Sequence, residues 1–128
     1  MGDPIDDLLV RVRADNDLEL AAVSADGMLV GIDADEGIDA EGVCLTAGDI
    51  FLMKSALGAE LGRGTPTLLT VEYEGGTLVV GSLTHGAELI LLTRNGANLG
   101  RLRLAARKFQ ADYAEAQAQP AESLVVSR

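Results

Sequence analysis

The sequence predicts a single α+β domain with the order α-β-β-α-β-β-β-α, a five-stranded antiparallel sheet with helices on both faces. Strand-like segments occur in neighbouring pairs joined by Asp-Gly, Gly-Gly and His-Gly turns, which favours antiparallel hairpins. Segments with helical spacing of apolar residues stand before, between and after these strands. The 128 residues, 48% of them apolar, are enough for one domain with its own core.

The first helix is predicted over residues 4–14, because Asp3 is a favourable N-cap and Pro4 suits the first helical position. The first two strands are predicted as a hairpin over residues 18–33. Its turn is Asp26-Gly27, since a type I′ turn needs positive φ at both central residues and these two tolerate it.

A long second helix is predicted over residues 39–62, after an acidic connector, and Gly62 with Pro66 closes it. At roughly 100° per residue its apolar residues spread over more than one face. We expect one face to cover the sheet: Val43, Ala47, Ile50, Leu57 and Leu61. A second face carries small residues: Cys44, Gly48, Ser55, Ala59 and Gly62. A third face is apolar and points away from the sheet, and Leu45, Leu52 and Ala56 form it.

Three further strands are predicted over residues 67–74, 77–84 and 88–94. The last two are apolar at both alternating sets of positions, which indicates a sheet covered on both faces. The half-polar pattern of 67–74 is typical of an edge strand. A final helix is predicted over residues 98–117, with an apolar stripe of Leu99, Leu102, Ala106, Phe109 and Tyr113. The domain then spans residues 1–118, and residues 119–128 form a flexible tail.

Charge narrows the possible partners. The net charge is −10, and residues 1–64, with 14 acids and 4 bases, carry all of it. This argues against nucleic acid and anionic membranes, and favours a basic protein surface as partner. A single cysteine and an acidic N-terminus without a signal peptide fit a reducing, cytoplasmic location. No uninterrupted apolar run approaches the ~18 residues of a membrane span.

The sequence contains no recognisable catalytic, metal or cofactor site. The acids from Asp33 to Glu41 lack the spacing of a calcium loop, so we interpret them as a solvated acidic segment before a helix N-terminus. Asn98 as an N-cap explains the turn before the last helix without a phosphate ligand. His85 is the only histidine, and Cys44 has no basic neighbour in sequence, which indicates a buried structural thiol. We expect no enzyme activity and no cofactor.

Four stretches together resemble the roadblock/LC7 family. They are the LAAVSADGMLVGID hairpin, the central helix closing as LGAELGRGTP, the strand pair TLLTVEYEGGTLVVGSL, and NGANLGRLRL at the start of the last helix. The resemblance covers roughly residues 4–113. It implies a homodimer or heterodimer with paired central helices and sheets joined edge to edge. It is greatest to the bacterial branch, whose members resemble the activator of the Ras-like GTPase that controls gliding polarity.

The resemblance implies a binding module in which the paired central helices contact a small Ras-like GTPase. On this hypothesis, one group of residues on the central helix contacts the partner: Leu45, Asp49, Leu52, Met53 and Ala56. The strip of small residues lets the two helices approach closely, and so forms the dimer interface: Cys44, Gly48, Ser55, Ala59 and Gly62.

Alternatives remain open at this stage. The tail residues Leu124, Val125 and Val126 would serve equally to cover the third face of the helix within one chain. A scaffold or adaptor dimer without a GTPase, like the dynein light chains, would use the same surfaces. A small-molecule sensor would need a roomy pocket with converging polar groups, and the apolar filling of residues 77–93 argues against one.

Overall fold

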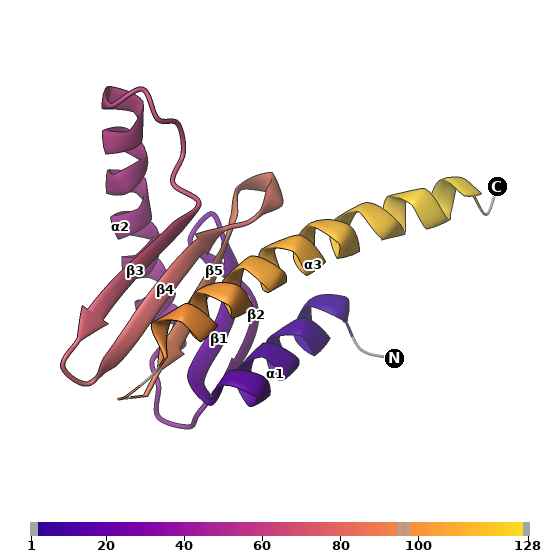
Figure 1. The fold of residues 1–128 in the computed structure, drawn as a ribbon. Helices are drawn as coiled ribbons and strands as arrows, with labels where there is room; N and C mark the ends of the chain where they lie inside the picture. Colours follow the sequence, from indigo (N-terminus) through magenta and orange to yellow (C-terminus); the bar gives the residue numbers. More distant parts are fainter. Residues whose placement is uncertain (1–2, 95, 97, 127–128) are drawn as a thin grey trace.

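Five strands form one antiparallel sheet in the order β2-β1-β5-β4-β3 (Figure 1). The computed structural model describes residues 3–94, 96 and 98–126, with side chains described as far as residue 118. The strands are β1 (Leu18–Ala25), β2 (Met28–Ala34), β3 (Leu68–Tyr73), β4 (Gly76–Ser82) and β5 (Ala87–Thr93). The helices are α1 (Pro4–Asn16), α2 (Ala40–Glu60) and α3 (Leu99–Val126), with a short 3-10 turn at Thr84–Gly86. The predicted order of elements is confirmed.

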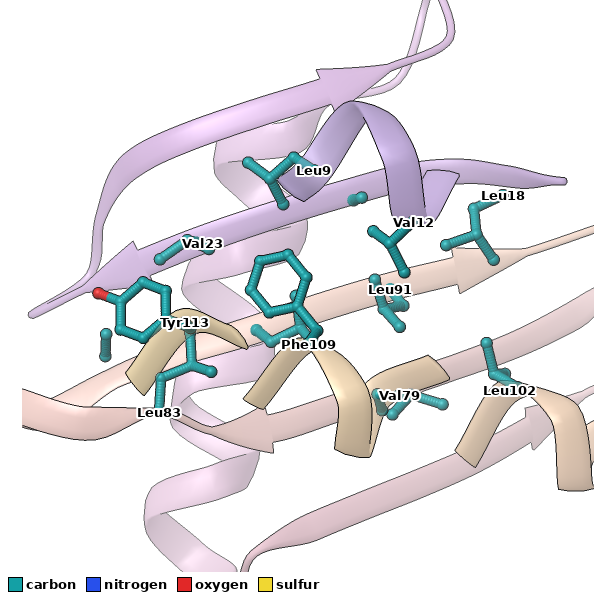
Figure 2. Close-up of a cluster of buried hydrophobic side chains, with 14 residues drawn as sticks. Leu9, Val12, Leu18, Val23, Val79, Leu83, Leu91, Leu102, Phe109 and Tyr113 are labelled. Carbon is teal, nitrogen blue, oxygen red and sulfur yellow. The ribbon is translucent and has the colours of Figure 1, made fainter. Parts of the chain in front are cut away.

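Helices α1 and α3 lie side by side on one face of the sheet (Figure 1). Their apolar side chains meet those of the central strands in the larger of two core clusters. Figure 2 shows Leu9 and Val12 of α1 facing Phe109 and Tyr113 of α3 across this layer. The predicted stripe of the last helix is confirmed, since its residues from Leu102 to Tyr113 are buried and Leu99 is half-buried.

Helix α2 covers the opposite face of the sheet, and it is the one described helix on that face. Its buried residues all lie between its first residue and its middle turn: Ala40, Cys44, Ala47 and Phe51. Phe51 is the last buried residue of the helix. The C-terminal part of α2 projects beyond the sheet (Figure 1). The second core cluster is therefore small and lies under one end of α2.

The predicted hairpin turn is confirmed by its backbone. Asp26 and Gly27 both have positive φ, 54° and 77°, as a type I′ turn requires.

Strand β3 is an edge strand, as its half-polar pattern predicted, and β2 is the other edge. Both edges of the sheet are thus free of a further strand in the described chain.

The acidic connector between β2 and α2 is more tightly held than the sequence indicated. Arg13 of α1 pairs with Asp33, at 3.5 Å, and with Asp35. Arg94, after β5, also pairs with Asp35. The expectation of a solvated segment is wrong for Asp33 and Asp35, because cations from two distant segments fold back onto them, whereas Glu36 and Glu41 are exposed. The network fixes the entry of the chain into α2.

The last helix is longer than expected. It continues to Val126, so the expected end near residue 117 is wrong. The segment around Pro120 is rich in Ala, Glu and Gln, which favour the helical conformation on both sides of the proline. Flexibility of residues 119–128 stays a prediction. The side chains of Leu124, Val125 and Val126 lie outside the described residues, but α3 lies across the sheet from α2 (Figure 1).

Helix α2 ends in a Schellman motif, as the predicted glycine stop requires. Gly62 has a φ of 66°, and the amide of Arg63 donates to the carbonyl of Gly58 at 2.9 Å. The following loop then turns back so closely that a Cβ added at Gly58 would overlap the carbonyl oxygen of Gly64. This helical position therefore needs glycine for space and not for conformation.

We predict that Gly58→Ala destabilises the protein although alanine is the better helix former by about 1 kcal/mol. The overlap with the Gly64 backbone should outweigh that gain and lower the free energy of unfolding by roughly 1–3 kcal/mol in urea denaturation. Gly100→Ala in α3 is the control, since its Cβ would make only ordinary contacts and stability should hold or rise. A Gly58→Ala protein as stable as the wild type would contradict this packing.

Candidate partner-binding surface

Large apolar side chains on α2 are exposed to solvent along most of its length. Their exposed fractions are 57% for Leu45, 69% for Leu52, 74% for Met53, 51% for Leu57 and 63% for Leu61. A monomer seldom leaves a contiguous apolar surface of this kind open, which makes this surface the candidate interaction site. The third face of the predicted helix is thus confirmed as uncovered by the described chain.

The helix is rotated relative to the face that we expected to cover the sheet. Only Ala47 of the expected residues is fully buried, while Leu57 and Leu61 are exposed. The strands beneath present large side chains, including Leu20 and Ile90, which fill the layer. The small residues of α2 therefore face the sheet, because small side chains let the helix pack close to the strands. The leucines of α2 then point to the two sides of the helix.

This rotation turns Cys44 toward the sheet. Its side chain is 2% exposed and packs against the strands of its own chain. Burial, with a smaller contribution from the charge of Glu88, raises the pKa of the thiol to about 11. The prediction of a buried structural thiol is confirmed, and the burial argues against the interface role, which stays a prediction.

A groove of about 580 Å³ lies between α2 and the strand ends near the β1–β2 turn. It unites residues that the sequence assigned to two separate surfaces. Leu45, Asp49 and Leu52 from the predicted partner site line it together with Gly48 and Ser55 from the predicted dimer strip. The other predicted residues, Met53, Ala56, Ala59 and Gly62, are exposed and do not line this groove.

A second groove, of about 480 Å³, lies on the other side of α2, toward β3 and β4. Val43, Thr46 and Ile50 of the helix form one wall, and Tyr73 with Leu78 of the strands forms the other. Sequence reasoning missed this surface because it placed Val43 and Ile50 beneath the helix. Lys54 was a usable signal: a lysine beside the assumed sheet-facing stripe argued for a rotated helix.

Length and composition alone would allow α2 to cross a membrane, and it is the one described helix that meets those criteria. Asp49 and Lys54 lie in its middle, where a lipid environment is costly for charges. Its first half is also packed on the sheet. The exposed apolar faces are therefore better matched to another protein. Among the described residues no group of His, Cys, Asp and Glu is arranged to hold a metal ion.

We predict that Cys44 is unreactive in the folded protein. At pH 8 a pKa of about 11 instead of 9.0 lowers the thiolate fraction roughly a hundredfold. Alkylation by iodoacetamide, followed by mass spectrometry, should be at least that much slower in buffer than in urea. The free energy of unfolding should also fall as the pH rises from about 9 to 11, because only the unfolded thiol has then lost its proton. Equal alkylation rates in both states would contradict the buried position.

No protein-family model matches the sequence, and no curated protein matches it. Solved structures do match. The gliding protein MglB of Thermus thermophilus superposes with a TM-score of 0.81 at 16% identity, over 91% of this chain and 92% of that one. An MglB with a tetrameric arrangement gives 0.77 at 19% identity, over 91% and 94%. A roadblock/LC7 domain from Streptomyces avermitilis gives 0.70 at 16% identity, over 94% and 97%. The chain therefore has the roadblock/LC7 fold.

Proposed function

We propose that the chain is a non-catalytic regulatory module of the cytoplasm that forms a homodimer and binds a small Ras-like GTPase through α2. The observation that carries this proposal is the exposure of large apolar side chains on both sides of a helix that one chain leaves half uncovered. The sequence resemblance to the bacterial GTPase-regulator branch supports the choice of partner. The likeness in fold to MglB, a gliding protein, supports a regulatory role.

The dimer forms through the side of α2 that faces β3. The groove of Val43, Ile50 and Tyr73 is open there, and Leu57 and Leu61 continue its apolar surface beyond the sheet. A two-fold axis beside β3 would place this stripe against its own copy and bring the two β3 edges together. Such an arrangement would bury the exposed apolar side chains of α2 and pair the free backbone groups of the β3 edge at the same time.

The GTPase binds on the other side of α2, at the groove lined by Leu45, Asp49 and Leu52. Met53 and Ala56 extend this surface, since both are exposed. The wall is apolar with an acidic rim, which suits a partner that combines apolar and basic residues. The module would act by positioning groups of the GTPase, and none of its own side chains is assigned a chemical step.

An adaptor dimer without a GTPase is the alternative, because the same two surfaces would serve it. Only the identity of the bound partner separates the two functions. Purified small Ras-like GTPases of the native organism, loaded with a non-hydrolysable GTP analogue, provide the direct test in a pull-down. Absence of binding to any of them, with dimerisation intact, would favour the adaptor.

We predict that Leu57→Arg converts the dimer to a monomer, since two copies would bring like charges and an unsatisfied cation into an apolar seam. Sedimentation equilibrium should show the dimer dissociation constant rising roughly tenfold or more. Val10→Arg is the matched control, because Val10 is similarly exposed but lies on α1, and it should leave the dimer intact. Wild-type protein that stays monomeric at high concentration would contradict the proposed dimer.

We predict that Leu52→Glu abolishes binding of the GTPase and leaves the fold intact, because the side chain is exposed and lies on the wall of the partner groove. Titration calorimetry with the GTPase measures the loss, and circular dichroism checks the fold. Leu104→Glu on α3, also exposed, is the control and should bind as the wild type does. Unchanged affinity of the Leu52→Glu protein would remove this surface from the proposal.

A further inference from the structure

The groove between α2 and the β1–β2 turn has a carboxylate at its base. Glu88 is the second residue of β5 and pairs in register with Ser24 of β1 and Ser82 of β4. Its neighbour Ile90, two residues on, belongs to the core cluster under α2, so Glu88 points to the same face. Its Oε1 lies 3.3 Å from the position that a Cβ on Gly48 would take, which places the carboxylate directly against the helix.

Glu88 is half-buried, yet its carboxylate has no hydrogen-bond or ion-pair partner among the side chains and backbone described as far as residue 118. The acids of the connector show the contrast, since Asp33 and Asp35 are paired with arginines. Partial burial raises the pKa of the Glu88 carboxyl, because desolvation disfavours its charged form. Partial loss of hydration is a cost to the charged form, and a cation placed against the carboxylate would offset it.

The surroundings of Glu88 indicate what would offset this cost. Asp26 and Asp49 stand on the rim, and Leu45, Phe51 and Leu52 form apolar walls. None of the residues that line the groove is Lys, Arg or His. The groove therefore combines a negative base and rim with apolar walls, and it lacks any internal cation.

We propose that this groove binds a segment of a basic protein partner that sets an arginine or lysine on the Glu88 carboxylate and an apolar side chain between Leu45 and Leu52. The proposal deepens the proposed function, since it rests on this side of α2 being the partner-binding side. Arginine fits best, because its planar group donates two parallel hydrogen bonds to a carboxylate.

A second copy of this chain is the less suitable occupant. The chain carries a net charge of −10, and the acidic half that contains most of α2 and the β1–β2 turn has only four basic residues. Arg13, one of those four, is engaged with Asp33 and Asp35. Docking of one acidic half onto another would set like charges together, whereas a basic partner is attracted to the whole surface.

The test uses selection from a library of short random peptides displayed on phage, with the intact purified protein as bait. Selected peptides should share an arginine or lysine close in sequence to a leucine, isoleucine, methionine or phenylalanine. Synthetic versions should bind the Glu88→Gln protein roughly tenfold or more weakly, since a charge-assisted bond is lost. Their affinity should fall with salt for the wild type and be less sensitive to salt for Glu88→Gln.

Glu74→Gln is the matched control, because Glu74 is an exposed acid at the β3–β4 turn, far from the groove residues, and should bind the peptides as the wild type does. Circular dichroism confirms that both variants fold. Peptides without a basic residue, or equal affinity for wild type and Glu88→Gln, would overturn the proposal. So would selected peptides that match this chain's own sequence, which would assign the groove to a second copy.

The two proposals fail separately. If no GTPase binds but basic apolar peptides do and depend on Glu88, the groove proposal holds and the GTPase assignment falls. If a GTPase binds with equal affinity to wild type and Glu88→Gln and selection gives no basic consensus, the GTPase assignment holds and the groove proposal falls.

Discussion

The structure depends on the difference in width between the five-stranded sheet and α2, the one described helix that packs on the face opposite α1 and α3. Strands spaced about 4.8 Å apart make a layer roughly twice as wide as one helix, so α2 leaves a strip uncovered on each side. On the opposite face, α1 and α3 together complete the layer (Figure 1). The two open grooves follow from this geometry, and each holds apolar side chains that a complete layer would have buried.

The way α2 packs on the sheet determines what these grooves present. The strands beneath it supply the large side chains of the shared core, so the helix contributes mainly small ones: Ala40, Cys44 and Ala47, with Phe51 at the end. Leucines are then displaced to the sides, where they remain exposed. Gly48 lets the Glu88 carboxylate lie against the helix, so the groove on that side is lined by three acids, Asp26, Asp49 and Glu88, whereas the other groove is lined by one, Asp39. The two sides of α2 therefore differ in chemistry, and this difference supports two different occupants.

Local signals in the sequence were enough to predict the order of elements, the Asp26-Gly27 turn and the edge position of β3, because each depends on residues close together in the chain. The rotation of α2 was not predictable in the same way. It depends on the volumes of side chains from β1, β4 and β5, and a helical wheel contains no information about them. The same cause explains why Cys44 was assigned to an interface, and why Glu88, a lone acid in a strand, was not singled out at all.

Several groups in the single chain lack a favourable contact, and two different partners would supply these contacts. Exposed leucines on α2, strand edges without a neighbouring strand, and a half-buried carboxylate without an ion-pair partner among the described side chains each leave a favourable contact unmade in the single chain. A second copy at β3 would supply the first two contacts on one side, but it would leave Glu88 untouched because that residue lies in the other groove. A partner with a cation is the simplest way to supply the remaining contact. The acidic half of the chain would attract a basic partner at a distance. The Glu88 carboxylate would then bind the cationic side chain of that partner.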